Sequence, residues 1–304
     1  METKDLKDFS KNIIGKVTFD YDIKNLNWFN IGGKTKVYFK PETLDELIRF
    51  LKIYQNRSNI FILGAGSNVL FDDEIYNGTI IKLGKKFSNI TLLGENKIIA
   101  GASTLDKKLA EFAKENELSG FEFLYSIPGT IGGGIRMNAG CFDSEFKDIL
   151  ISIQLIDFNG NIKTIPADKI DFSYRGNDIP KNYIFLSATF KGIKSNREEI
   201  QKKMGILKLK KEKAQPSKIK TGGSTFKNPN NVKKKVWELI KKSVPTDTSF
   251  GDAKISEKHC NFFINNGKAS SKDIEDLFQK VKKQVFEKTG VNLELEIKII
   301  GNNQ

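Results

Sequence analysis

Two glycine-rich segments are the first candidates for chemistry in this 304-residue sequence. Gly64-Ala65-Gly66-Ser67-Asn68 directly follows a short apolar run, so its backbone N–H groups and polar side chains could hold a phosphate. The segment matches neither the Walker sequence nor the G-x-G-x-x-G fingerprint, and a plain tight turn explains it equally well. Ile127 to Gly134 is more informative, because four glycines in six positions weaken regular structure. That run suits a backbone pressed against a flat ligand or a pyrophosphate, with a purely structural loop as the alternative.

Three polar side chains elsewhere could act on a bound molecule. Ser224 lies in the loop Gly222 to Pro229, where the residue types alone favour a serine that bonds its own backbone. Arg175 has the planar, bidentate geometry that suits a carboxylate, and it is one of only five arginines among 50 basic residues. Glu296 belongs to an alternating run near the C-terminus, which by itself predicts no more than a solvated strand face.

The elements that must position these residues follow from hydrophobic periodicity. In the N-terminal part, Thr43 and Glu46 predict a capping box, and a strand at Ile60 to Leu63 delivers the first glycine loop. Asn159-Gly160 predicts a hairpin turn, and Gly290 a helix stop. The expected apolar faces are Leu44, Leu47, Ile48 and Leu51 of one helix, Leu105, Leu109, Phe112 and Ala113 of a second, Ile149, Ile151, Ile153 and Leu155 of a strand, Ile200, Met204 and Leu207 of a lysine-rich helix, Ile274, Leu277, Phe278, Val281 and Val285 of a long helix, and Leu293, Leu295, Ile297 and Ile299 of a final strand.

Composition narrows the classes of protein. The net charge of +13 would suit nucleic acid, but it comes mainly from lysine, with no stacked aromatic and basic motif, so solvated lysines are the simpler interpretation. Two cysteines, Cys141 and Cys260, and the single His259 give no disulfide framework, metal-ligand spacing or serine–histidine triad. Both cysteines are expected to be inert and buried. Without an apolar segment of membrane-spanning length or a signal-peptide core, we expect a cytoplasmic protein.

Several of these segments, taken in order, resemble the UDP-N-acetylenolpyruvoylglucosamine reductase family, also called the UDP-N-acetylmuramate dehydrogenases or MurB. The resemblance covers about Asn27 to Gly301. The segments that carry it are Asn27 to Gly33, Gly64 to Leu70, Ile127 to Gly140, Phe172 to Arg175, Gly222 to Pro229, Ser256 to His259 and Leu293 to Glu296. It implies an α+β fold, with a two-lobed FAD-binding region of the vanillyl-alcohol-oxidase (PCMH) type at 1–86 and 87–195 and a substrate-binding domain at 196–304. It also implies the shorter form of the enzyme, which lacks an extra tyrosine-bearing loop.

The resemblance further implies a reaction and its residues. NADPH passes a hydride to FAD, and the flavin passes it to the enolpyruvyl group of a UDP-sugar, as a step of peptidoglycan synthesis and so of cell-wall formation. Ser224 would donate the proton, Arg175 would meet the substrate's carboxylate, and Glu296 would stabilise the enolate as a protonated acid with a raised pKa. Lys227 and Asn228 would hold the substrate. FAD would be bound by Gly64, Ala65, Gly66, Ser67, Asn68, Gly129, Thr130, Gly132, Gly133 and Ala139.

Two departures and two rival functions accompany this interpretation. Asn30 replaces an arginine usual in the first motif, and Cys260 replaces an alanine after Ser-Glu-Lys-His. An alcohol oxidase of the same superfamily would share the glycine loops but not Gly222 to Pro229. A basic nucleic-acid-binding protein would instead lose binding steeply with salt. We expect no metal, no nucleic acid, a monomer, and one cleft that serves NADPH and substrate in turn, because no second dinucleotide fingerprint appears.

Overall fold

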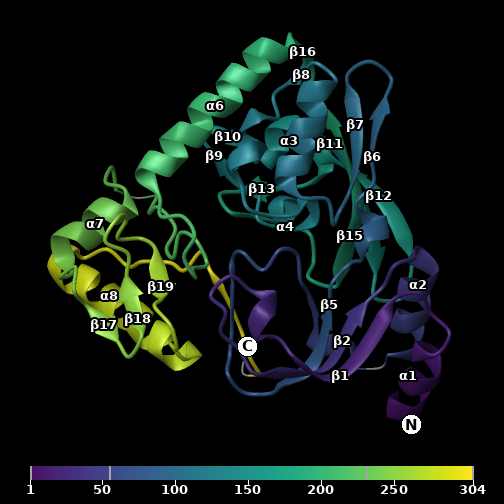
Figure 1. The fold of residues 1–304 in the computed structure, drawn as a ribbon, viewed down its shortest axis with the longest axis horizontal. Helices are drawn as coiled ribbons and strands as arrows, with labels where there is room; N and C mark the ends of the chain where they lie inside the picture. Colours follow the sequence, from purple (N-terminus) through teal and green to yellow (C-terminus); the bar gives the residue numbers. More distant parts are fainter. Residues whose placement is uncertain (1, 55, 231, 303–304) are drawn as a thin grey trace. The chain divides into compact units, whose positions relative to one another are not determined.

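The computed structural model describes residues 2–54, 56–230 and 232–302, with the helices and strands drawn in Figure 1. The chain forms two compact units. The first contains residues 1–19, 37–65 and 78–211, and the second contains 20–36, 66–77 and 212–304. Each unit is therefore assembled from separate stretches of sequence. The expected division at 86 and 195 into three consecutive parts stays a prediction.

Near the N-terminus, helices α1 (Glu2–Ser10) and α2 (Leu44–Ile53) share a hydrophobic core with a four-stranded sheet. The sheet order is β1 (Lys16–Asp22), β2 (Lys34–Lys40), β5 (Tyr76–Ile81) and β3 (Ile60–Ile62). Aromatic side chains join helix to sheet, with the rings of Phe39 and Phe50 stacked at 4.2 Å between centroids. The predicted helix face is buried at Leu47 and Leu51.

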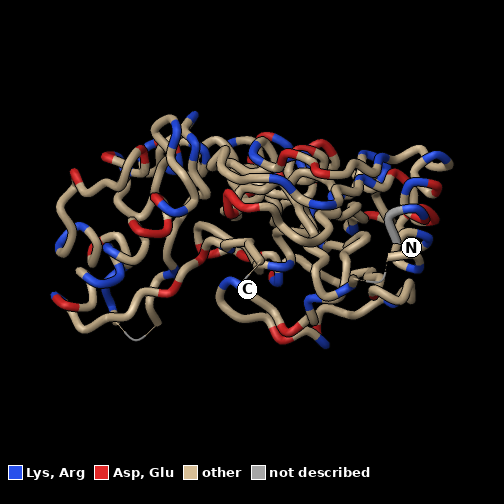
Figure 2. The backbone as a smooth tube through the Cα atoms, turned by 90° about the horizontal axis from the view of Figure 1, so that it is seen from below, with Lys and Arg blue, Asp and Glu red and all other residues tan. Residues whose placement is uncertain are grey.

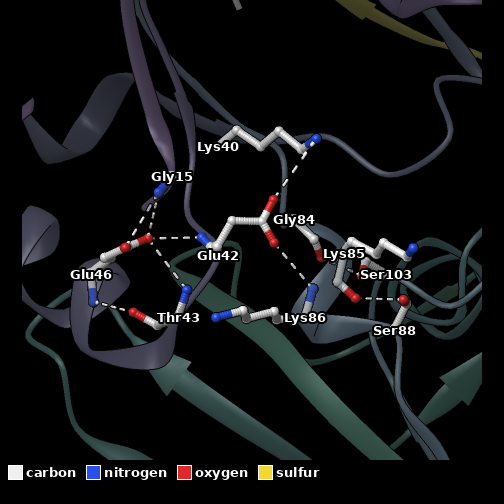
Figure 3. Close-up of polar contacts among 10 residues, drawn as sticks. All are labelled: Gly15, Lys40, Glu42, Thr43, Glu46, Gly84, Lys85, Lys86, Ser88 and Ser103. Carbon is white, nitrogen blue, oxygen red and sulfur yellow. Dashed lines mark hydrogen bonds and ion pairs between the residues drawn. The ribbon is translucent and has the colours of Figure 1, made fainter. Parts of the chain in front are cut away.

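The predicted capping box of α2 is confirmed. Thr43 Oγ1 accepts the N–H of Glu46, and the Glu46 side chain bonds back to the Thr43 backbone. The buried Glu46 carboxylate also accepts N–H bonds from Ile14, Gly15 and Glu42, as Figure 3 shows for the last two. Burial raises the pKa of Glu46, but these backbone bonds together outweigh it and hold the pKa below its usual value.

The first unit also contains a five-stranded antiparallel sheet, in the order β12 (Ile162–Pro166), β11 (Leu150–Asp157), β15 (Tyr183–Lys191), β7 (Lys97–Gly101) and β6 (Ile90–Leu93). The hairpin predicted at Asn159-Gly160 joins β11 to β12, with Gly160 at φ +89°. Helix α3 (Asp106–Glu115) shares a core with this sheet. Leu105 was expected on the buried helix face but precedes the helix and is 50% exposed.

The second unit is built around helix α8 (Ser271–Thr289), whose predicted apolar face is buried at all five positions. Ser270 caps its start, and Gly290 ends it at φ +70°, the conformation glycine adopts most easily. The helix packs on α7 (Val236–Ser243) and on a sheet of β17 (Ser249–Phe250), β18 (Ala253–Ile255) and β19 (Phe263–Asn265).

The final strand is shorter than the alternation at Leu293 to Ile299 predicts. Only β20 (Lys298–Ile300) is a strand, and it pairs in parallel with β4 (Val69–Phe71). The preceding residues bond instead to the Ser224 loop, where Glu296 N donates to Thr225 O at 2.8 Å and Lys227 N donates to Glu294 O at 2.9 Å. These loop partners end the regular ladder before residue 298.

Helix α6 (Arg197–Ala214) is the lysine-rich helix that the sequence predicts, with Ile200 and Met204 buried. Acidic residues are interspersed with the basic ones along the backbone in Figure 2. Over the described residues, no helix combines the length and apolar character that a membrane span requires. The remaining short strands and α-helices are β8 (Leu118–Ser119), β9 (Gly140–Cys141), β10 (Ser144–Glu145), β13 (Phe172–Ser173), β14 (Gly176–Asn177), β16 (Ile193–Lys194), α4 (Ile131–Arg136) and α5 (Phe146–Ile149).

Candidate active site

Within the first unit, the two glycine-rich segments meet at Gly64. A Cβ atom on Gly64 would lie 2.6 Å from Thr130 Oγ1 and 3.9 Å from the Cα of Gly133. Lys82, which the sequence did not single out, donates from Nζ to Gly64 O at 3.0 Å. Burial, and to a lesser degree Lys40, lowers the pKa of Lys82. A glycine backbone with a cation beside it suits an anionic ligand.

The second glycine segment is only partly the open loop that its composition suggested, since residues 131–136 form the short helix α4. Packing explains two of its glycines. A Cβ on Gly134 would overlap the ring of Phe146, and one on Gly132 would lie 3.2 Å from the Cβ of Ala102. Gly133 is exposed and, apart from Thr130 Oγ1 at 3.5 Å, has space for a side chain. Its bare backbone is therefore the part of the helix that packing leaves for a ligand.

In the second unit, Gly66 is required by the chain itself. Its φ is +70°, and a Cβ would overlap the carbonyl oxygen of Leu26. Asn68 ties this loop to the C-terminal segment, because its Nδ2 donates to Glu296 O at 3.0 Å and its carbonyl accepts from Lys298 N at 3.0 Å. Ser67 and Asn68 are half-buried. The roles of these residues in FAD binding stay a prediction.

Arg175 lies in the first unit, at the tip of the two-residue turn between β13 and β14. Its φ of +60° is unusual for a residue with a side chain, and such backbone strain is concentrated at functional positions. The guanidinium lies over the Tyr174 ring, 4.8 Å from its centroid, and Nη2 donates to Gly140 O at 2.9 Å. The expected carboxylate-binding group is therefore fixed to the segment that contains Ala139.

Ser224 lies in the second unit, in a loop held on both sides. It forms an isolated antiparallel bridge with Phe262, and Gly223 before it has φ +82°. The buried Asn261 fixes the next residues, since its Oδ1 accepts from Phe226 N at 3.0 Å and its Nδ2 donates to Phe226 O at 2.9 Å. Ser224, which is half-buried, thus belongs to a loop that these contacts fix in place.

Glu296 lies beside the Ser224 loop. Its N–H donates to Thr225 O, and its half-buried side chain extends from the segment that also contacts Asn68. The second unit therefore brings together two of the three residues expected to be catalytic. Of the expected substrate-binding pair, Lys227 forms a 2.5 Å ion pair with Glu294, and Asn228 Oδ1 accepts from Val236 N at 3.1 Å. Their contacts to substrate stay a prediction.

The departures from the family pattern have local explanations. Asn30 has φ +57°, which asparagine tolerates better than arginine, and its Nδ2 donates to Asn25 Oδ1 at 2.6 Å. Cys260 donates from Sγ to Trp237 O at 3.0 Å.

Both cysteines are half-buried rather than fully buried as expected. Burial raises the pKa of the Cys141 thiol to about 11, so the thiol stays protonated and poorly nucleophilic at neutral pH.

Sequence reasoning also missed Asp106, the first residue of α3. Its side chain is wholly buried, and neither carboxylate oxygen has a hydrogen-bond partner among the described residues. Asp106 N donates to Gly129 O at 3.1 Å, and a Cβ on Gly129 would overlap the carboxyl. Burial raises the pKa of Asp106 well above its usual range. Only the tertiary structure reveals this acid beneath the Pro128 to Thr130 loop, because its sequence position resembles an ordinary helix start.

Because the folded protein holds the Asp106 proton more tightly than the unfolded chain, this group's contribution to stability falls as pH rises toward the folded-state pKa. Asp106→Asn removes that loss. We expect urea unfolding between pH 5 and pH 8 to show the variant gaining stability over wild type as pH rises, by up to about 1.4 kcal/mol for each pH unit that lies between the unfolded-state and folded-state pKa of the carboxyl. Asp168→Asn, at an exposed aspartate, is the control. A stability difference between Asp106→Asn and wild type that does not change with pH would contradict the prediction.

Comparison with known proteins decides the family. Residues 215–300 match the model of the UDP-N-acetylenolpyruvoylglucosamine reductase C-terminal domain, and residues 35–166 match an FAD binding domain. A reductase of that name from Pelagibacter ubique is 58% identical over 99% of this chain and all of its own length. The chain belongs to the UDP-N-acetylenolpyruvoylglucosamine reductase family. It is an FAD-dependent oxidoreductase with the predicted α+β fold of the PCMH type.

Two further relatives agree with this assignment. A UDP-N-acetylenolpyruvoylglucosamine reductase from Rickettsia bellii is 47% identical, over 94% of each chain. The crystal structure of the MurB reductase from Thermus caldophilus is 29% identical, with a TM-score of 0.80 over 94% of this chain and 98% of that one. The two glycine-rich segments of the family therefore lie on the same scaffold here.

The residues present fit FAD. In the first unit, Gly133 offers exposed, bare backbone, Gly64 packs against Thr130 close to it, and Lys82 adds a positive charge beside Gly64. Such a surface suits the pyrophosphate of a dinucleotide, because a side chain larger than that of glycine would keep the phosphates away from the backbone N–H groups. In the second unit, the Ser67-Asn68 turn is anchored to the segment of Glu296. The chain thus holds glycine backbone and a cation of the kind that FAD needs.

Proposed function

We propose that this protein reduces UDP-N-acetylglucosamine enolpyruvate to UDP-N-acetylmuramate with NADPH, as a step in peptidoglycan precursor synthesis. The observation that carries the proposal is the 58% identity with the Pelagibacter reductase over 99% of this chain. The fixed arrangement of the Ser224 loop beside Glu296 gives further support. Because both substrates are soluble nucleotides, we infer a cytoplasmic reaction, and we infer that the enzyme acts as a monomer.

The chemistry assigns a role to each of the three polar side chains. When bound, FAD supplies a hydride from N5 to the terminal vinyl carbon of the enolpyruvyl group. Negative charge then develops on the adjacent carbon and spreads into the carboxylate. Arg175 pairs with that carboxylate through its fork of N–H donors, and Glu296 stabilises the enolate oxygen. Ser224 donates its proton to the carbon, which is basic enough to take a proton from a hydroxyl, and water restores the serine.

Turnover with purified protein tests the proposal. We expect a yellow protein that absorbs near 450 nm, at roughly the wavelength of other flavoproteins. We also expect sustained NADPH oxidation only when the enolpyruvyl UDP-sugar is added. If one cleft serves NADPH and substrate in turn, the kinetics are ping-pong with mutual competition. A colourless protein, or NADPH oxidation that ignores the sugar, would contradict the proposed function, and a ternary complex would contradict the shared cleft.

A further inference from the structure

The turn that carries Arg175 is held by two asparagine amides, that of Asn138, which bonds to β13, and that of Asn177, which belongs to β14. On β13, Ser173 O accepts from Asn138 Nδ2 at 3.1 Å. On β14, Asn177 Nδ2 donates to the carbonyls of Ile135 and Arg136, at 2.8 Å and 3.1 Å, at the end of helix α4. Strands of two residues are too short to hold a hairpin unaided. These two amides therefore fix where the turn stands.

Asn138 is the more constrained of the two. Its side chain is wholly buried, and its backbone has φ +39°, a conformation that costs energy for a residue with a side chain. Every polar atom of the amide is used, because Nδ2 also donates to Glu145 Oε2 at 3.0 Å and Oδ1 accepts from Lys147 N at 3.2 Å. The residue thus joins the β9–β10 hairpin to the β13–β14 hairpin through one buried group.

The same short segment holds the tip of the turn. Arg175 Nη2 donates to Gly140 O at 2.9 Å, two residues after Asn138 in the chain. The guanidinium is consequently tied to the segment that contains Ala139, one of the residues expected to bind FAD. A long side chain on a strained turn gains most from such anchoring, because fixing the group in advance removes the entropy cost of ordering it when its ligand binds.

We propose that Asn138 and Asn177 are positioning residues, which fix the Arg175 turn so that its guanidinium is already in place when the substrate's carboxylate arrives. The inference rests on the proposed function of Arg175. Neither amide needs to touch the substrate. Their effect is on the selectivity of the site for a ligand that carries the enolpyruvyl carboxylate over the same nucleotide sugar without it.

Binding to the oxidised holoenzyme separates this role from a purely structural one. Dissociation constants are measured from the change in flavin absorbance, with the enolpyruvyl UDP-sugar and with UDP-N-acetylglucosamine, which lacks the carboxylate. Asn177→Ala should weaken binding of the first ligand about tenfold and leave the second nearly unchanged. Asn116→Ala is the matched control, because Asn116 Nδ2 donates to a helix C-terminal carbonyl in the same way, to Phe112 O at 2.8 Å. It should leave both constants unchanged.

A double-mutant cycle with Arg175→Ala completes the test. If Asn177 acts through Arg175, adding Asn177→Ala to Arg175→Ala should weaken binding little further. Asn138→Gly, which permits the positive φ but removes the amide, should behave like Asn177→Ala once FAD is bound. Additive effects, or equal weakening of both ligands by Asn177→Ala, would overturn the positioning role. If Arg175→Ala weakens binding of both ligands equally, it is the proposed role of Arg175 in carboxylate binding that fails.

Discussion

Replacing Ser224 with alanine is expected to lower steady-state turnover by roughly 10²- to 10⁴-fold, the usual contribution of a positioned acid or base. The first half-reaction should be spared, so NADPH should still bleach the flavin at close to the wild-type rate. The physical reason is that the hydroxyl is needed only when charge develops on the substrate carbon. Stopped-flow absorbance of each half-reaction makes the measurement, with NADPH alone and then with the enolpyruvyl UDP-sugar.

Thr225→Val provides a matched control for this loop. Thr225 is next in sequence, wholly buried, and its Oγ1 has no hydrogen-bond partner among the described residues. Removing that hydroxyl changes the loop's chemistry without removing a bond, so turnover should stay near wild type. Equal losses in Thr225→Val and Ser224→Ala would mean that the loop's conformation is at fault. Full turnover in Ser224→Ala would exclude the serine as the proton donor.

The local elements were predictable wherever one physical rule acts within a few residues. The Thr43–Glu46 capping box, the Asn159-Gly160 hairpin and the stop at Gly290 all appear where the sequence places them. In each case the controlling contact is between neighbours in the chain. The apolar face of α8 was equally clear, because five buried positions at helical spacing leave little alternative.

Glycines were harder to interpret, because a missing side chain looks the same whether a ligand or the protein fills the space. Gly66 faces the Leu26 carbonyl and Gly134 faces the Phe146 ring, so the fold alone requires both. Gly133 has no such neighbour. Only three-dimensional contacts separate these cases, because composition left a ligand-binding backbone and a purely structural loop both open.

Tertiary partners explain the remaining differences. The alternation at Leu293 to Ile299 predicts a longer strand, but hydrogen bonds with the Ser224 loop take the place of a ladder before residue 298. Asp106 gave no signal, because an acid at a helix start is ordinary until its burial is known. The choice of Glu296 over Glu294 as the expected catalytic acid came from family resemblance and not from the pattern of the strand.

The structure distinguishes Glu294 from Glu296 by their burial and contacts, which the alternating sequence pattern could not do. Glu294 has a side chain 74% exposed and paired with Lys227, whereas Glu296 is half-buried beside the loop of Ser224. A buried donor is worth more to a developing charge than one screened by water. The two positions therefore allow a direct comparison of the same residue type at two sites of different burial, two residues apart in one segment.

Glu296→Ala should consequently lower kcat by roughly 10²- to 10³-fold, the cost of removing one donor from an oxyanion site. Glu294→Ala loses the ion pair of an exposed glutamate with Lys227, a small contribution to stability, and should leave kcat near wild type, with any effect through Lys227 confined to substrate binding. Glu296→Gln keeps an N–H donor and should fall between the two. Single-turnover oxidation of the reduced enzyme by substrate, followed across pH, makes the comparison. Equal rates in the two alanine variants would remove Glu296 from the mechanism, and full activity of Glu296→Gln at every pH would show that an ionisable acid is not required there.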